Sequence, residues 1–92
     1  MKLIDLLKNW EDVDEELIIF QENETDFNAD IILAYGEVGD GGIKIENGRK
    51  YTYLIEVFLA KEFVGEWVDS LTFKPGYNEI AKRLHEYARN DA

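Results

Sequence analysis

Few side chains in this sequence have the chemistry of a catalytic nucleophile. There is one histidine, His85, one serine, Ser70, and no cysteine. A Ser-His-acid constellation needs its serine on a sharp turn beside an oxyanion site. Ser70 instead falls near the end of one predicted helix and His85 within another, and no glycine-rich feature accompanies the serine. Nucleophilic catalysis is therefore disfavoured, and we expect His85 to be a half-buried residue at a helix edge, or an interface residue.

The carboxylates suggest a metal site only at first sight. Asp12, Asp14 and Glu16 alternate as the early ligands of a calcium loop do. Leu17 then occupies the sixth position, where such loops need glycine, and Asn23 the twelfth, where they use glutamate. Paired carboxylates for glycoside hydrolysis need a substrate cleft, which a domain of 92 residues seldom has. We therefore expect no metal, no other cofactor and no enzymatic activity.

Binding of a partner is the function that remains after these exclusions, and the distribution of charge indicates what kind of partner. The chain has 20 Asp and Glu against 10 Lys and Arg, a formal charge of −10. Residues 1–40 hold twelve of these acids and two of the bases, so the whole net charge lies there. Such a field repels nucleic acid and anionic membranes and attracts basic protein surfaces. Acidity also serves solubility alone in many small proteins, and that alternative stays open.

Two parts of this acidic half are predicted to bind the partner: residues 11–16, the acidic run, and residues 22–30, the acidic turn. Their carboxylates offer ion pairs to Lys or Arg, and an aromatic side chain anchors the centre of such an interface. Phe27, in a turn, is the expected exposed anchor, whereas Phe20 and Tyr35 are expected in the core. Whether the two parts form one patch or two is open. The predicted binding residues are Glu11, Asp12, Asp14, Glu15, Glu16, Glu22, Glu24, Asp26, Phe27 and Asp30.

The first half of the chain must position these residues with one helix and two strands. Apolar residues at helical spacing predict a helix over residues 2–10, ending at Trp10. The acidic run cannot be buried unpaired, so it is predicted to be a solvated loop or strand lead-in. Short apolar, β-branched segments predict strands at residues 17–20 and 30–38, joined as an antiparallel pair.

The second half begins with a hairpin signal and continues into helices. Asn47-Gly48 predicts a two-residue turn that places Glu46 opposite Arg49. A strand is predicted at about residues 50–56 and a helix at about 58–72, the latter from a stripe at helical spacing. A last amphipathic helix follows Pro75. The stripe consists of Ile55, Leu59, Phe63, Trp67 and Leu71, with Val64 and Val68 beside it.

These elements predict one α+β domain over residues 1–92. A small, mainly antiparallel sheet of about four strands carries an N-terminal helix and two C-terminal helices packed on it. The absence of cysteine fits a reducing compartment. The N-terminus lacks the pattern of a signal peptide, and no window approaches the roughly 18 apolar residues of a membrane span, so we expect a cytoplasmic protein.

Part of the C-terminal half resembles a known group of proteins. Tyr53-Leu54-Ile55, residues 60–68 and the closing residues 84–92 look like a family of small uncharacterised bacterial domains that end in a helix with a tyrosine and an Asn-Asp-Ala tail. The size, the acidity and the lack of catalytic residues are similar to immunity proteins of contact-dependent growth inhibition systems. The resemblance implies a protein that binds and neutralises a toxin, often a basic nuclease, and it assigns no functional position to this chain.

The sequence therefore predicts a cytoplasmic immunity protein that binds a basic toxin domain, with a nuclease as the first expectation, through residues 11–30. The alternative is a non-catalytic homo-oligomer with a regulatory or structural role, whose acidity serves solubility. The free protein is expected to be a monomer or a weak homodimer that binds neither nucleic acid nor membrane.

Overall fold

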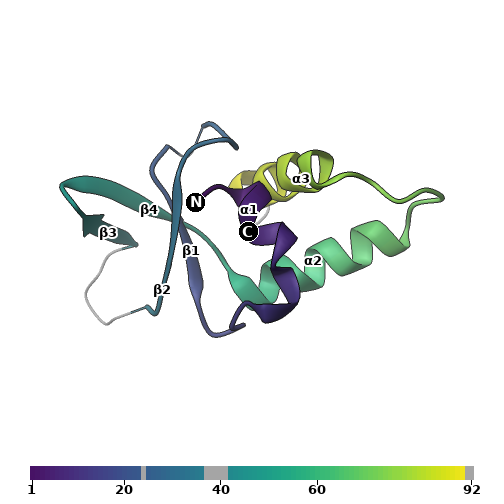
Figure 1. Cartoon of the computed structure of the whole chain (residues 1–92), viewed down its shortest axis with the longest axis horizontal. Helices are drawn as coiled ribbons and strands as arrows, with labels where there is room; N and C mark the ends of the chain where they lie inside the picture. Colours follow the sequence, from purple (N-terminus) through teal and green to yellow (C-terminus); the bar gives the residue numbers. More distant parts are fainter. Residues whose placement is uncertain (24, 37–41, 91–92) are drawn as a thin grey trace.

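A computed structural model describes residues 1–23, 25–36 and 42–90 of the chain (Figure 1). Three α-helices, one short 3-10 helix and four strands make up this part. The elements are α1 (Leu3–Lys8), η1 (Trp10–Asp12), β1 (Ile18–Gln21), β2 (Ile31–Ala34), β3 (Ile43–Glu46), β4 (Arg49–Glu56), α2 (Val57–Asp69) and α3 (Tyr77–Asn90). The predicted α+β class and the predicted order of helices and strands are confirmed.

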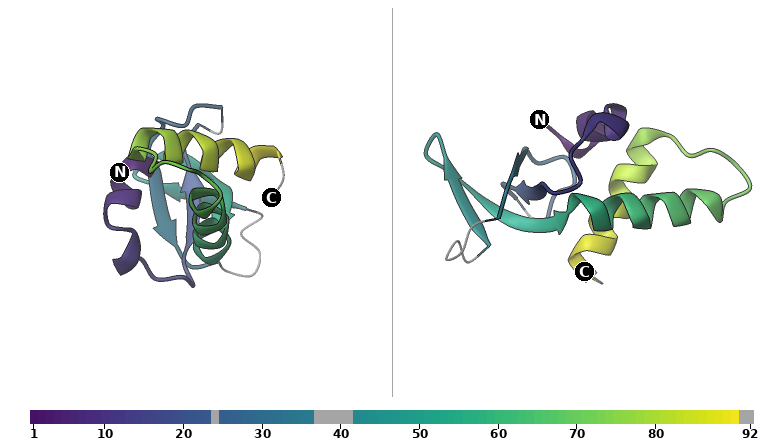
Figure 2. Two further views of the ribbon diagram at one scale, coloured as in Figure 1. Left: turned by 90° about the vertical axis from the view of Figure 1, so that its right-hand side faces the viewer. Right: turned by 90° about the horizontal axis from the view of Figure 1, so that it is seen from below.

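The four strands form one antiparallel sheet in the order β2-β1-β4-β3. The long strand β4 pairs with β3 along its first half and with β1 along its second half. A register irregularity between Ile19 and Phe20 bends the β1–β4 pair, as bulges do. The sheet consequently curls, with the β3–β4 hairpin at one end of the molecule and the helices at the other (Figures 1 and 2).

The hairpin turn has the geometry that its sequence predicts. Asn47 has φ of 53° and Gly48 has φ of 76°. Two consecutive positive φ values define the type I′ turn, for which Asn-Gly is the preferred pair. Glu46 and Arg49 lie opposite each other, as expected. The Arg49 guanidinium, however, also reaches the neighbouring acidic turn, where it lies 3.4 Å from the Glu22 carboxylate.

The helices pack on one face of the sheet around a single cluster of buried apolar side chains. Ile19, Ile31, Leu54 and Ile55 supply the sheet side of this core, and the strand register places Ile19 opposite Ile55. The helix side consists of Leu3, Leu6, Leu7, Val57, Ala60, Val64, Ala81, Leu84 and Ala88. Burying this apolar area is the main favourable contribution to folding.

The opposite face of β1 is covered by the curled hairpin. Phe20 is 2% exposed and packs edge-on against Tyr53, with ring centroids 6.4 Å apart. The ammonium group of Lys44 lies 5.9 Å from the centre of the Phe20 ring. Phe20 is therefore a core residue, as predicted, although it lies on the face away from the helices.

Several element ends differ from the predictions. The strand predicted at residues 30–38 ends at Ala34, and residues 37 and 38 lie outside the described part. At Gly36 the backbone approaches β1 so closely that an added Cβ would lie 2.8 Å from Ile18 Cδ1. The helix predicted at 58–72 spans Val57–Asp69 instead, and Ile55 belongs to β4. Ser70 ends the helix because its hydroxyl and its N–H both donate to the Trp67 carbonyl.

Candidate functional site: an acidic hollow at one end of the sheet

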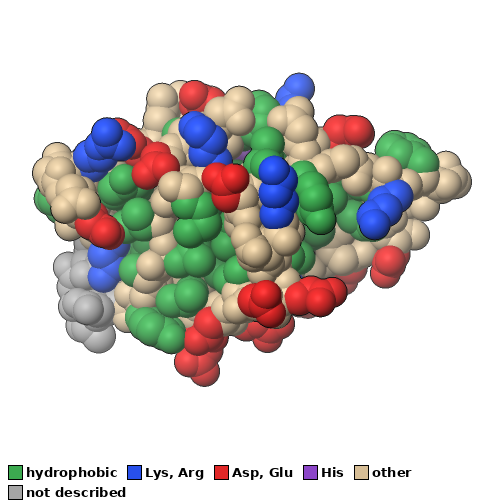
Figure 3. Space-filling model, viewed as in Figure 1, with side chains coloured by type: hydrophobic (Ala, Val, Ile, Leu, Met, Phe, Trp, Pro, Cys, Tyr) green, Lys and Arg blue, Asp and Glu red, His purple; other side chains and the backbone are tan. Residues whose placement is uncertain are grey.

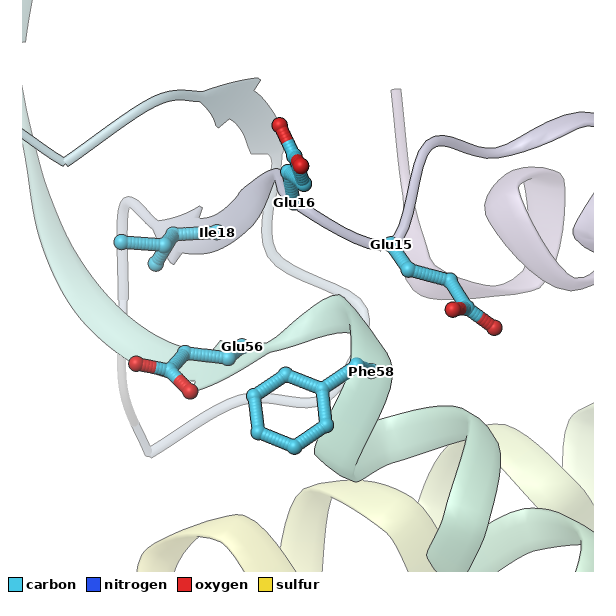
Figure 4. A pocket seen from close by; sticks show the side chains of 5 residues that line it. All are labelled: Glu15, Glu16, Ile18, Glu56 and Phe58. Carbon is cyan, nitrogen blue, oxygen red and sulfur yellow. The ribbon is translucent and has the colours of Figure 1, made fainter.

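An open hollow of about 470 Å³ lies where the acidic run enters β1 (Figure 4). Glu15, Glu16, Ile18, Glu56 and Phe58 line it, and we call these five residues the acidic hollow. Figure 4 shows Ile18 and Glu56 projecting to the same side of neighbouring strands, with the Phe58 ring beside Glu56 at the start of α2. Sheet register explains this grouping, because Ile18 of β1 pairs with Glu56 of β4.

The hollow combines an apolar floor with a negative rim. Phe58 is 45% exposed although it is a large aromatic residue. Glu15 and Glu16 are exposed, and Glu56 is half-buried. Among residues 1–23, 25–36 and 42–90, the ion pairs are Met1 amine to Asp30, Arg49 to Glu22 and Arg83 to Glu86. None of these ion pairs neutralises a carboxylate of the hollow.

Asp14 and Tyr35 extend this surface beyond the hollow. The Tyr35 hydroxyl donates a 2.9 Å hydrogen bond to Asp14 Oδ2, and the Glu16 N–H donates one of 2.9 Å to Oδ1. These two hydrogen bonds lower the pKa of the Asp14 carboxyl below its usual range, and the bond from the Glu16 N–H has the larger effect. The same bond to Asp14 raises the pKa of Tyr35. Tyr35 is 56% exposed, so the prediction that it belongs to the core is wrong.

The acidic run itself is divided between two sides of the molecule. Glu11 and Asp12 lie in η1 and not in the loop or strand lead-in that the sequence suggests. Glu11 borders a different groove, of about 550 Å³, between Trp10 and α2. Lys61 is held there, because its ammonium group donates to the Val13 carbonyl at 2.8 Å and lies 5.9 Å from the Trp10 ring centre. Only the second half of the run, from Asp14 to Glu16, therefore contributes to the hollow or its edge.

The acidic turn lies at the other end of β1 and is bonded into the fold. Asn23 and Asp26 accept hydrogen bonds from backbone N–H groups two residues later, the usual role of these side chains in turns. Asp30 accepts from the Met1 amino group at 2.7 Å and from the Tyr51 hydroxyl at 3.0 Å. The Met1 amino group is the main cause of the lowered pKa of Asp30.

Phe27 does not serve as the exposed anchor that the sequence predicts. Its side chain is half-buried and packs against the hydrophobic core. The turn folds back on the sheet because Gln21 Nε2 donates to the Asp26 carbonyl at 2.9 Å. This brings Phe27 close to Lys82 and His85 of α3. Glu24, which was also predicted to bind the partner, lies outside the described residues.

His85 is more deeply buried than expected. It is 6% exposed, and its Nε2 lies 3.1 Å from Oε1 of Gln21, which is fully buried. Each buried polar group thereby satisfies the other. His85 consequently ties α3 to β1 and is not at a helix edge, contrary to the prediction. Ser70 is engaged at the end of α2.

Four residues of the candidate surface were not among the predicted binding residues: Ile18, Tyr35, Glu56 and Phe58. Ile18 and Tyr35 were assigned to apolar strands, and Glu56 and Phe58 lie where the predicted strand meets the predicted helix. The only local signal is that Phe58 is an aromatic residue outside the helical stripe. Their meeting with Glu15 and Glu16 follows from strand register, which local patterns do not reveal.

The site and the fold define an acidic α+β domain with an open hollow that has an aromatic floor. Comparisons with protein families, with curated proteins and with solved structures found no match. No helix in the described ranges is long and apolar enough to cross a membrane. In the same ranges, no cluster of three or more His, Asp or Glu side chains is arranged to hold a metal ion.

Proposed function

We propose that this chain is an immunity protein that acts in the cytoplasm, where it binds and neutralises a basic toxin domain, with a nuclease as the expected partner. The acidic hollow is the centre of the proposed interface. Asp14 and Tyr35 form its edge. The proposal keeps the predicted kind of partner and moves the interface from the Phe27 turn to the opposite end of β1.

The unneutralised carboxylates of the hollow carry this proposal. Glu15, Glu16 and Glu56 surround one apolar floor without a described cation among them. Three carboxylates on one surface create a negative field there, and a cationic side chain from a partner is attracted to it. The field also speeds the encounter with a basic domain, while burial of Phe58 and Ile18 slows dissociation.

The test uses the C-terminal domain of the protein encoded directly upstream of this chain. A 1:1 complex on size-exclusion chromatography, with association that slows as salt rises, is the expected result. The triple variant E15K/E16K/E56K should slow association and weaken affinity at least about 100-fold. E66K/D69K/E79K makes the same change of charge on the exposed surfaces of α2 and α3 and is the matched control. Equal binding by both triple variants would contradict the proposed site.

A homo-oligomer is the second candidate because β3 exposes apolar side chains. Ile45 is 75% exposed and Ile43 is 38% exposed on this edge strand. Sedimentation at micromolar concentration separates the candidates, because the immunity proposal needs only a monomer. A dimer that dissociates in the variant I45K would favour the oligomer.

A further inference from the structure

The outer edge of β2 offers backbone groups for pairing. Strand order places β2 at an edge of the sheet. Glu22 N–H donates to the Asp30 carbonyl at 2.9 Å. Because bonded pairs alternate along antiparallel strands, Ile32 and Ala34 also bond to β1, while Ile31 and Leu33 direct their backbone groups outward. The Ile31 N–H donates a 2.6 Å hydrogen bond to the Met1 carbonyl, which confirms that the backbone groups of Ile31 point away from β1.

Beyond Met1 this edge is open within the described residues. Leu33 directs its N–H and C=O away from β1, and no described backbone group is bonded to them. The side chains of Ile32, Leu33 and Ala34 are all partly exposed. Beside them a hollow of about 410 Å³ extends to Glu46 and Asn47 of the hairpin. Figure 3 views this edge and shows apolar side chains gathered over β2, with Asp and Glu side chains beyond both ends and Lys or Arg side chains beside them at the upper end.

The composition of β2 distinguishes it from the other edge strand. Proteins discourage unwanted pairing at an edge with charged residues, proline or bulges. The sequence of β3 places Lys44 and Glu46 among its isoleucines, whereas the four residues of β2 are all apolar. An apolar, unbulged edge strand is a template for pairing with another extended chain.

The charge at the two ends of β2 decides what kind of chain suits this edge. Asp30 directly precedes β2 and is already paired with the Met1 amino group, whereas Tyr35, which directly follows β2, holds Asp14, a carboxylate that belongs to none of the described ion pairs. The Tyr35 end is therefore the negative end of this edge. A second copy of the chain would bring its own charge of −10 to that end. Charge complementarity therefore selects a basic segment over a second copy.

We propose that an extended basic segment of the partner pairs with the outer edge of β2 as a fifth strand. Its backbone bonds to the N–H and carbonyl of Leu33 and to the carbonyl of Ile31, because Met1 already occupies the Ile31 N–H. Its apolar side chains continue the surface of Ile32 and Ala34, and a Lys or Arg side chain meets Asp14 at the Tyr35 end of β2. The proposal takes the basic character of the partner from the proposed function and adds the mode of binding.

The test uses a synthetic nine-residue peptide in which valine alternates with threonine and lysine stands at both ends. Hydrogen exchange of the Leu33 amide, followed by NMR, should slow when the peptide binds at up to millimolar concentration. A peptide N-methylated at every second amide keeps one bonding edge and should still bind. A peptide N-methylated at every amide keeps its charge, loses both edges, and should bind at least about tenfold more weakly.

Two proline variants of the protein test the same pairing without any change to the peptide. In L33P proline removes an outward N–H that β1 does not use, a position at which edge strands tolerate proline. I45P makes the same change at the outward position of β3. L33P should weaken binding at least about tenfold and I45P by less than about twofold. Circular dichroism checks both folds, and the methylated peptides decide the question if L33P does not fold.

The outcomes separate this proposal from the proposed function. Equal binding of the unmodified and fully methylated peptides, no change at the Leu33 amide, or no binding at all overturns strand addition. If the unmodified and the fully methylated peptides bind equally and E15K/E16K/E56K abolishes binding of both, the acidic surface stands without the fifth strand. If methylation abolishes binding but charge reversal and salt leave binding unchanged, strand pairing at β2 is supported. The claim that the partner is basic is then rejected. A dimer of the unbound chain that L33P dissolves would make the occupant a second copy and overturn the proposal.

Discussion

The two acidic segments of this protein have similar composition and opposite roles in the fold. In the acidic turn, Asp30 and Glu22 have cationic partners, and Asn23 and Asp26 bond to the backbone. In the hollow that the acidic run enters, no described cation pairs with Glu15, Glu16 or Glu56. The charge of the turn holds the chain, whereas the carboxylates of the hollow belong to none of the described ion pairs.

This difference shows that the number of charged residues in a segment of sequence is a poor guide to a binding surface. A carboxylate that already has a partner gains little from a second cation, and moving it costs the bonds it makes. A carboxylate without one contributes little to stability and much to the external field. Measurements of stability and pKa at each segment can test this difference between the paired carboxylates of the turn and the carboxylates of the hollow.

The largest effect is expected under the acidic turn, at the buried Gln21. The variant Q21A removes the bonds to His85 and to the Asp26 carbonyl and leaves a cavity. The free energy of unfolding should fall by about 2–4 kcal/mol, measured by urea denaturation. F58A in the hollow is the matched truncation and should cost about 1 kcal/mol or less, because its side chain is 45% exposed. Equal decreases in the free energy of unfolding for Q21A and F58A would contradict the distinction between the acidic turn and the hollow.

Asp30 should show the next largest effect and a dependence on pH. The Met1 amino group lowers the pKa of Asp30 below its ordinary value of 3.8. The carboxylate therefore stabilises the fold at pH above the unfolded pKa, and this contribution is lost as pH falls through the lower folded pKa. D30N should cost up to about 1 kcal/mol at pH 7. Its stability should also fall less steeply than that of the wild type below about pH 4, and an unchanged acid profile would refute this role.

At the edge of the hollow the expected change is in a pKa and not in stability. Y35F removes the hydroxyl that donates to Asp14. The pKa of Asp14 should rise towards its usual range without reaching it, because the bond from the Glu16 N–H is the larger cause and remains. NMR titration of the Asp14 carboxyl measures this rise, and thermal unfolding serves as the control. An unchanged pKa would mean that the tyrosine does not hold Asp14 in solution.

The smallest effect is expected from neutralising the hollow itself. E15Q/E16Q removes two charges that have no described cationic partner, so repulsion decreases and no ion pair is lost. The urea midpoint should stay the same or rise slightly at low salt, while binding of a basic partner weakens. A clear loss of stability would show that these carboxylates support the fold. That result would also remove the contrast with the acidic turn.

Local patterns in the sequence were sufficient for the elements and their class. Helical spacing places α1 and α3, and Asn47-Gly48 defines the hairpin with Glu46 opposite Arg49. Element ends were less well predicted. Ile55 fits the helical stripe but belongs to β4, and α2 begins at Val57, one residue before the predicted start of the helix. Tyr35 follows an apolar run, but β2 ends before it.

The sequence by itself determined that this is an acidic α+β domain whose net charge lies in its first 40 residues. Only the tertiary structure decided which of those charges belong together. The pairing of Ile18 with Glu56 brings Phe58 to the acidic run, and the pairing of Gln21 with His85 draws the other acidic segment into the fold. Both depend on contacts between residues far apart in the chain, whose register is set by packing and a bulge and not by local propensity.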